Sequence, residues 1–218
     1  MQQYKRDFID FMMDVGVLTF GDFTTKSGRK TPYFVNTGLY RNGSQLQRLG
    51  EFYANAIAAE LGTSFDVIFG PAYKGIPLVA TTSAALCNQG HDVAFCFNRK
   101  EAKDHGEGGL LVGHKLTDGQ RVLVIEDVTT AGTSIRETVP ILKSTANIEL
   151  AGLVVSVDRA ERGPFGDGTA MQEVGKEFNM PTFAIVTVHE IMEHVDLSAE
   201  DRQRMEANLA EYGANSAN

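Results

Sequence analysis

Short apolar runs with few polar interruptions recur along this 218-residue sequence, and segments of helical length separate them. The clearest runs are 67–69, 122–125 and 150–157. Continuous Val, Ile and Leu are typical of strands that are buried on both faces, because a strand with one wet face alternates apolar and polar residues. Strands that alternate with helices form a parallel sheet through right-handed crossovers. The sequence therefore predicts an α/β fold with a central, mainly parallel sheet flanked by helices.

We expect a single domain over residues 1–218, because a chain of this length fits one core and no internal repeat divides it. A small N-terminal hood, mainly residues 1–40, combines a helical pattern with two short alternating runs that are typical of a hairpin. The core follows over about 41–190, and Ser44 is the candidate N-cap of its first helix. A last helix is expected over about 198–212.

The charge and the apolar pattern exclude several classes of protein. A net charge of −8, from 20 Lys and Arg against 28 Asp and Glu, argues against a protein that binds nucleic acid or coats an anionic membrane. No apolar run reaches the ~20 residues of a membrane span, and residues 1–10 lack the apolar centre of a secretion signal. Cys87 and Cys96 lack metal-ligand spacing, so we interpret both as reduced core residues of a cytoplasmic protein.

The loops that follow four of the predicted strands hold most of the unusual residues. They begin after Phe69, Phe97, Ile125 and Val157. Parallel sheets bind ligands at the carboxyl ends of their strands. We therefore expect these loops to meet at one edge of the sheet and to form the functional site there.

Residues 122–134 carry the strongest motif. A buried strand is expected to deliver two adjacent carboxylates, Glu126 and Asp127, and small and hydroxyl residues then lead into a helix. The backbone N–H groups at a helix N-terminus form an anion pocket that suits a phosphate, and carboxylates beside it suit sugar hydroxyls or a divalent cation. An ordinary turn capped by Thr130 or Thr133 is the simpler alternative, but it does not explain the paired carboxylates.

This segment resembles the signature with which type I phosphoribosyltransferases bind PRPP (5-phosphoribosyl-1-pyrophosphate), and the resemblance implies the fold of that family. It implies that Glu126 and Asp127 lie along the ribose hydroxyls, with Mg²⁺ nearby and bound mainly through PRPP and water. The residues implied to hold the 5′-phosphate form one continuous loop: Val128, Thr129, Thr130, Ala131, Gly132, Thr133 and Ser134. Family members usually have Asp where this chain has Glu126.

A long polar loop is expected over 98–113. Its basic residues could clamp a pyrophosphate, or its acidic residues could make it a solvated charged loop. The pattern Arg-Lys-Glu-x-Lys-x-His-Gly is similar to the catalytic loop of the orotate phosphoribosyltransferases, a branch of the family. The resemblance implies that Arg99, Lys100, Lys103 and His105 bind PRPP. It further implies that Lys103 and His105 are catalytic, with His105 as a candidate proton donor.

Two further segments resemble the same branch at the N-terminal side. Residues 26–36 are similar to its hood, which implies that Lys26 reaches PRPP and takes part in catalysis. The hood resemblance also implies that Phe34 and Val35 lie against orotate, and since the branch often has an aromatic at Val35, Phe34 alone would stack. Residues 70–75 resemble the pyrophosphate loop of the branch, in which Tyr73 and Lys74 would be ligands; taken alone, this stretch could be a plain turn.

Arg159 follows a predicted core strand, at the place where this branch holds the orotate carboxylate with an arginine. A guanidinium suits a planar carboxylate, although Arg159 beside Glu161 and Arg162 could equally form a surface ion pair. The resemblance also implies Thr130 as an orotate ligand.

Together, these segments imply Mg²⁺-dependent transfer of 5-phosphoribose from PRPP to N1 of orotate. The products would be orotidine 5′-monophosphate and pyrophosphate, in de novo pyrimidine biosynthesis. The resemblance implies a homodimer with shared active sites, in which Arg99, Lys103 and His105 reach into the neighbour's site. A purine or xanthine phosphoribosyltransferase and a non-catalytic PRPP sensor that regulates transcription are the alternatives. The 99–105 loop and Arg159 disfavour the former, and the sequence shows no DNA-binding extension for the latter.

Overall fold

The structure is a computed structural model that describes residues 1–24, 30–103, 109–129 and 131–214, with the backbone alone at 102, 103 and 109. Over these residues, a six-stranded sheet has the order β5-β4-β3-β6-β7-β8. All neighbouring strands are parallel except β5, which is antiparallel to β4. The strands are β3 (Val67–Gly70), β4 (Ala94–Lys103), β5 (Gly109–Gly113), β6 (Arg121–Ile125), β7 (Glu149–Asp158) and β8 (Thr182–Thr187). The predicted α/β class and the mainly parallel sheet are confirmed.

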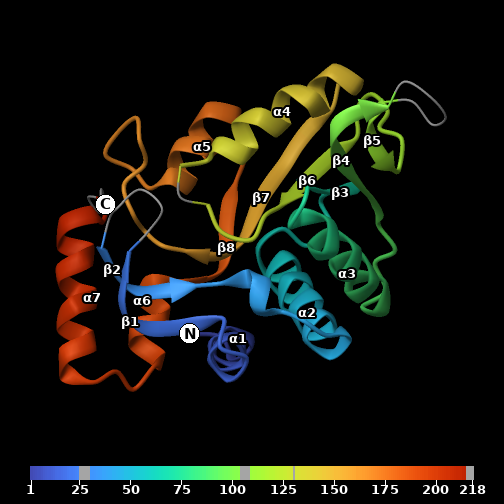
Figure 1. Cartoon of the computed structure of the whole chain (residues 1–218). Coiled ribbons are helices and arrows are strands. Elements are labelled where there is room, and N and C mark those ends of the chain that lie inside the picture. The colour runs from blue at the N-terminus through green and yellow to red at the C-terminus, as the bar shows by residue number, and fades with distance from the viewer. Residues whose placement is uncertain (25–29, 104–108, 130, 215–218) are drawn as a thin grey trace.

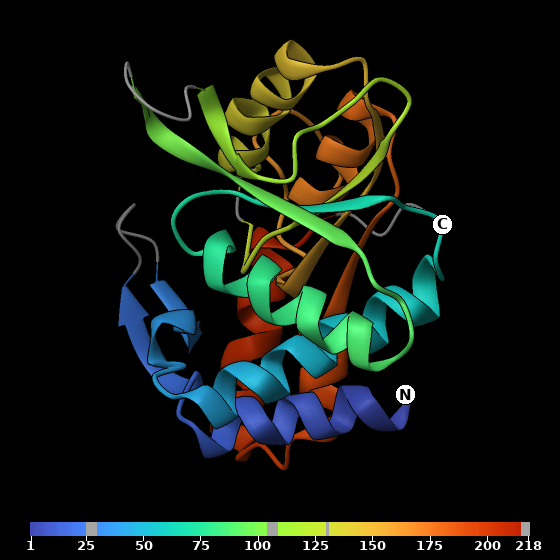
Figure 2. The same cartoon turned by 90° about the vertical axis from the view of Figure 1, so that its right-hand side faces the viewer.

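Helices cover both faces of this sheet. α4 (Thr133–Thr145) and α5 (Ala170–Phe178) lie on one face. α2 (Gly43–Glu60) and α3 (Gly75–Asn88) lie on the other, with α1 (Gln3–Asp14) beside α2 (Figures 1 and 2). The strands supply alternate residues to the two cores. In β6, Leu123 packs with the α2 and α3 side and Val124 with the α4 and α5 side, which explains why the strand sequences are continuously apolar.

The hood is a two-stranded antiparallel hairpin of β1 (Leu18–Thr24) and β2 (Lys30–Val35). The short 3₁₀ helix η1 (Thr37–Leu39) leads from it into α2. α6 (Val188–His194) follows β8, and α7 (Ala199–Tyr212) stands beside β2 (Figure 1). The hood therefore lies next to the last helix as well as to the core.

The stretch 98–113 is not the long loop that its polar composition predicts. β4 continues as far as Lys103, and β5 returns antiparallel to it from Gly109. Asn98 pairs with Leu111 and Lys103 with Gly109, with a shift of register between these pairs. Backbone pairing therefore stiffens both arms of the segment despite their polar side chains.

Two local expectations are also wrong. The N-cap of α2 is Asn42, whose Oδ1 accepts a hydrogen bond from the backbone N–H of Gln45 at 3.0 Å. Ser44 instead donates its hydroxyl to the same Oδ1 at 2.8 Å. Of the two free cysteines, Cys96 is buried as expected, but Cys87 is exposed on α3. Within the described ranges, no helix has the length and apolar character needed to cross a membrane.

Candidate active site

The carboxyl ends of four adjacent parallel strands bring the predicted site residues to one edge of the sheet. β4, β3, β6 and β7 are neighbours in that order. Tyr73, Lys74, Glu126, Asp127 and Arg159 follow strands of this set, and Arg99 and Lys100 lie in the second half of β4. The predicted meeting at one edge is confirmed for the segments after β3, β6 and β7, because parallel strands place their carboxyl ends together, whereas the segment after Phe97 continues β4 instead of forming a loop.

Asp127 lies at the centre of this edge, in contact with Lys74 and Thr37. Nζ of Lys74 is 2.7 Å from Oδ2 of Asp127 and 3.0 Å from Oγ1 of Thr37. Thr37 donates its hydroxyl to the same carboxylate oxygen at 2.7 Å. The Asp127 side chain is 13% exposed and the Lys74 side chain is 65% exposed. The lysine therefore has more room to move than the carboxylate.

Thr37 is a site residue that the sequence analysis missed. It belongs to η1, between the hood and α2, and it lies 90 positions before Asp127 in the chain. Since a lone threonine in a short connection has no distinctive pattern, no sequence signal could have singled it out.

The backbone at Asp127 is anchored to β7. Its carbonyl accepts hydrogen bonds from the N–H of Ser156 at 2.8 Å and from the Ser156 hydroxyl at 2.5 Å. Val128 then forms a parallel bridge with Val157. These bonds extend the pairing of β6 and β7 beyond Ile125. They therefore fix the position of the Asp127 backbone that carries the side chain.

Glu126 is held differently from its neighbour. Oε1 accepts the hydroxyl of Ser134 at 2.5 Å, and the Glu126 carbonyl accepts the hydroxyl of Tyr53 at 2.7 Å. Burial raises the pKa of Glu126 to about 7, although the Ser134 hydrogen bond opposes this rise. Asp127 raises the pKa further, and Lys74 lowers it. The Glu126 carboxyl group therefore binds its proton more tightly than an ordinary glutamate does, which the sequence does not reveal.

The loop after these carboxylates packs tightly against α5. Gly132 precedes α4 with φ +70°, and a Cβ at this position would lie 2.4 Å from Cγ2 of Val174. Thr129 accepts the N–H of Gly132 at 3.0 Å, and Arg136 donates to the carbonyl of Ala131. No described side chain caps the start of α4, so a turn capped by Thr133 is not what forms, and the alternative cap Thr130 lies outside the described residues. N–H groups at a helix start that no described side chain caps suit an anion.

The predicted pyrophosphate loop, residues 70–75, lies beside the second half of β4. Asn98 accepts the N–H of Ala72 at 2.8 Å, and Nζ of Lys100 lies 5.6 Å from the ring centre of Tyr73. A cavity of about 480 Å³ opens here. Its lining includes Ala72, Asn98, Arg99, Lys100, Thr133 and Ser134. The structure thus brings the basic residues of one predicted segment to the phosphate loop of another.

Arg159 is buried beneath the hood, so the surface ion pair considered from the sequence is wrong in its location. The guanidinium donates from Nε and Nη2 to Oε1 of Glu161, at 3.0 and 2.7 Å. Nη2 also donates to Oγ1 of Thr31 at 3.3 Å, and the guanidinium carbon lies 4.6 Å from the ring centre of Tyr33. Glu161 is a second residue that the sequence analysis did not assign to the site.

The aromatic predicted to contact orotate is accessible. Phe34 is 41% exposed and stacks on Phe23, with ring centres 5.7 Å apart. Val35 is partly buried at the end of β2. Phe34 can therefore present a ring to a ligand, while Val35 packs against the hydrophobic core.

Four predicted residues are not placed by these contacts. Lys26, His105 and Thr130 lie outside the described residues, and Lys103 ends β4 with its backbone alone described. Their implied roles remain predictions.

The adjacent carboxylates fit a cation that is bound mainly through other ligands. The described part of the chain holds no cluster of three or more His, Cys, Asp or Glu side chains able to bind a metal. Glu126 and Asp127 offer hard oxygen donors at one point of the edge. Mg²⁺ commonly takes one or two carboxylates and completes its shell with water and substrate phosphates, so these donors suit it.

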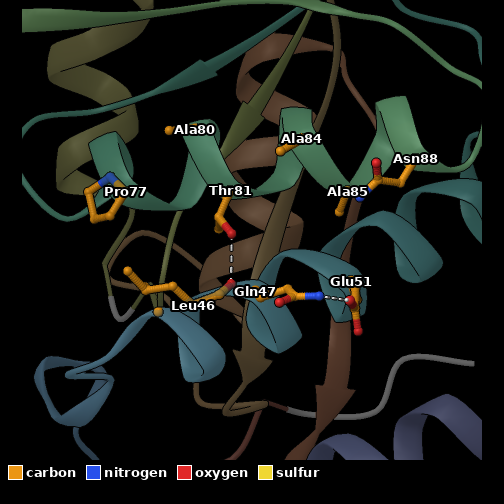
Figure 3. A pocket seen from close by; sticks show the side chains of 10 residues that line it. Leu46, Gln47, Glu51, Pro77, Ala80, Thr81, Ala84, Ala85 and Asn88 are labelled. Atoms are coloured by element: carbon orange, nitrogen blue, oxygen red, sulfur yellow. Dashed lines mark hydrogen bonds between the residues drawn. The ribbon is translucent and has the colours of Figure 1, made fainter.

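A separate groove of about 350 Å³ lies between α2 and α3 (Figure 3). The helices touch at Gly50, where a Cβ would lie 2.5 Å from the carbonyl oxygen of Thr81. The hydroxyl of Thr81 donates to the carbonyl of Leu46 at 2.7 Å (Figure 3). The lining is mainly apolar and includes none of the predicted site residues, so the groove is distinct from the strand edge.

Comparisons with known proteins agree with this geometry. The family model described as "Phosphoribosyl transferase domain" matches residues 37–183. An orotate phosphoribosyltransferase of Clostridium beijerinckii is 54% identical, over 98% of this chain and 100% of that protein. One from Pseudomonas aeruginosa is 51% identical, with the same shares covered.

A solved structure extends the likeness to three dimensions. The crystal structure of orotate phosphoribosyltransferase from Francisella tularensis superposes with a TM-score of 0.85 at 39% identity. The match covers 95% of this chain and 99% of that one. On this agreement of fold, site and sequence, the chain is a glycosyltransferase that belongs to the orotate phosphoribosyltransferase family.

Proposed function

We propose that residues 1–218 form one catalytic domain that transfers 5-phosphoribose from PRPP to N1 of orotate. The bond between ribose C1 and the pyrophosphate oxygen breaks, and a bond from C1 to N1 forms. Pyrophosphate leaves with the bonding electron pair, and N1 loses its proton. The products are orotidine 5′-monophosphate and pyrophosphate, as in the pyrimidine pathway that the family name implies.

The chain's own residues act mainly by positioning and charge. Asp127 and Glu126 would bind the ribose hydroxyls, and residues 128–134 would hold the 5′-phosphate. This assignment is supported by the anchored backbone of Asp127 and by the start of α4, which no described side chain caps. Both features keep donors and acceptors fixed before the substrate arrives.

Basic residues would neutralise the leaving group. Tyr73 and Lys74 would bind the pyrophosphate of PRPP, with Lys100 beside Tyr73. Lys26 of the same chain and Lys103 and His105 of the neighbouring chain would close around it, and His105 would donate a proton to the departing oxygen. Glu126 and Asp127 would lie beside Mg²⁺ held mainly by PRPP and water, and the metal would supply positive charge to the leaving pyrophosphate.

The base would lie under the hood. Phe34 would stack on the orotate ring, with Val35 beside it and Thr130 as a polar ligand. Arg159 would hold the carboxylate, which its fork of N–H donors suits. We also propose a cytoplasmic homodimer in which Arg99, Lys103 and His105 serve the neighbour's site.

The contact of Lys74 with Asp127 is the observation that carries this proposal. It joins the predicted pyrophosphate ligand to the predicted ribose ligand, as one molecule of PRPP would require. Incubating the purified protein with PRPP, Mg²⁺ and orotate tests it directly. Loss of orotate with equimolar pyrophosphate and orotidine 5′-monophosphate is expected; no product with both substrates present would contradict the proposal.

A further inference from the structure

Resting on the proposed function, we propose that Glu161, fixed by the C-terminal end of the chain, is a positioning residue that aims Arg159 at the orotate carboxylate. Neither residue is a surface group: Arg159 is 8% exposed and Glu161 5%. A buried guanidinium has few ways to be oriented, so the partner that binds it decides where its remaining donors point.

The hydrogen bonds of Arg159 to Glu161 and Thr31 leave Nη1 of the guanidinium available to a ligand. Nε and Nη2 both donate to a single oxygen, Oε1 of Glu161, and Nη2 also donates to Thr31. Nη1 makes no hydrogen bond to any residue that the structure describes. The ring of Tyr33 lies against the guanidinium at 4.6 Å and restrains its plane.

A backbone turn brings the two charged residues together. Ala160 has φ +52°, a backbone conformation that residues other than glycine rarely adopt. The carboxylate of Asp158 accepts the N–H of Ala160 at 2.8 Å and stabilises this turn. Arg159 and Glu161, on either side of Ala160, can then pair although they are only two positions apart.

The C-terminal strap, residues 212–214, holds this turn from outside. The carbonyl of Tyr212 accepts the N–H of Arg162 at 2.8 Å, and the carbonyl of Ala160 accepts the N–H of Ala214 at 2.9 Å. Glu161 and Gly213 form an antiparallel bridge between these two bonds. The strap follows α7, so the end of the chain fixes the backbone that carries Glu161.

In this arrangement the C-terminal strap, far from the phosphate loop, contributes to the orientation of Arg159. The strap holds Glu161, Glu161 holds Arg159, and Thr31 joins Arg159 to the hood. A disturbance along this series should weaken recognition of the orotate carboxylate. It should leave PRPP recognition unchanged, because none of these bonds involves Lys74 or Asp127.

Steady-state kinetics of three variants tests the proposal. KM for orotate, KM for PRPP, kcat and the melting temperature are measured for Glu161→Ala, Glu161→Gln and Gly213→Ala. Glu206→Gln is the matched control, because Glu206 is exposed on α7 and belongs to none of these contacts. Gly213→Ala acts on the strap, since a Cβ there would lie 2.3 Å from the carbonyl oxygen of Leu209.

We expect KM for orotate to rise about 10- to 100-fold in Glu161→Ala and to rise in Gly213→Ala, with KM for PRPP within about threefold of the wild-type value. Glu161→Gln should retain orotate binding within about threefold, because an amide carbonyl can accept the two bonds that now share Oε1. If Glu161→Ala fails to fold, KM for orotate in Glu161→Gln and Gly213→Ala still tests the positioning role of Glu161.

An unchanged or lower KM for orotate in folded Glu161→Ala would overturn the proposal, since the freed guanidinium would then bind at least as well. Equal losses in the alanine and glutamine variants would also overturn it, as would parallel rises in both KM values. The Arg159→Ala variant distinguishes the role of Arg159 from the positioning role of Glu161. If that variant binds orotate normally, the assigned role of Arg159 fails; if it loses orotate binding while the Glu161 variants do not, the positioning role alone fails.

Discussion

Nζ of Lys74 lies 2.7 Å from Oδ2 of Asp127. The lysine ends the loop after β3, and the aspartate follows β6, so the contact joins two loops of the sheet edge. The same oxygen also accepts the hydroxyl of Thr37 at 2.7 Å. Two partners from different segments therefore hold the Asp127 carboxylate in one direction.

Asp127→Asn should lower kcat/KM for PRPP by about 100-fold or more, because the change removes a charged acceptor and leaves Lys74 without its counter-ion. PRPP-dependent turnover is the measurement. Asp66→Asn is the control, since Asp66 pairs with Arg121 at the opposite end of the strands. A wild-type profile for Asp127→Asn would refute the ribose assignment.

Stability should depend on pH through Glu126, whose pKa is raised from 4.5 to about 7 by burial. The folded chain holds this proton more tightly than the unfolded chain, so protonation favours folding. The stability linked to Glu126 is complete below about pH 4.5 and is lost as the pH rises through about 7.

Glu126→Gln imitates the protonated acid and should lack this loss. We expect the free energy of unfolding of Glu126→Gln, relative to the wild-type protein, to increase between pH 4.5 and pH 7. Urea denaturation of both proteins across that range is the measurement. Parallel pH profiles would show that Glu126 ionises normally in the folded chain.

Lys103→Ala should lower kcat by roughly 10²–10³-fold if Lys103 neutralises the departing pyrophosphate. The matched control is Lys115→Ala, because Lys115 is an exposed lysine beyond β5 and outside the candidate site. Single-turnover measurements at saturating substrates separate this effect from product release. Near-normal turnover would exclude the role.

Hybrid dimers should recover activity if the segment 99–105 serves the neighbouring site. Lys103→Ala and Arg159→Ala homodimers, each impaired, are mixed under conditions of subunit exchange. A hybrid then contains one site with both native residues, so activity should rise with exchange time. The absence of any recovery, with exchange verified by labelled subunits, would place each site within one chain.

The strand edge could be predicted because its signals are local. The apolar run before Glu126 defines a buried strand, and the strand order then places Lys74, Asp127 and Arg159 at one edge. These inferences need only the period of the pattern and the direction of parallel strands.

What the sequence did not disclose depends on contacts between distant segments. Thr37 reaches Asp127 across 90 positions, and Gly213 pairs with Glu161 through backbone atoms that carry no residue signature. The 98–113 stretch was predicted as a loop from its polar side chains, whereas its backbone pairs as β4 and β5. Asn42 and Ser44 both suit the N-cap of α2, and the structure gives that position to Asn42.

Base selectivity tests most directly whether orotate is the base that accepts 5-phosphoribose. The purified protein is supplied with PRPP and Mg²⁺ and, separately, with orotate, adenine, hypoxanthine or uracil, and pyrophosphate release is followed. The account predicts turnover with orotate and a kcat/KM for each other base that is lower by at least about 10³-fold. Turnover of a purine in preference to orotate, or PRPP binding without turnover of any base, would contradict it.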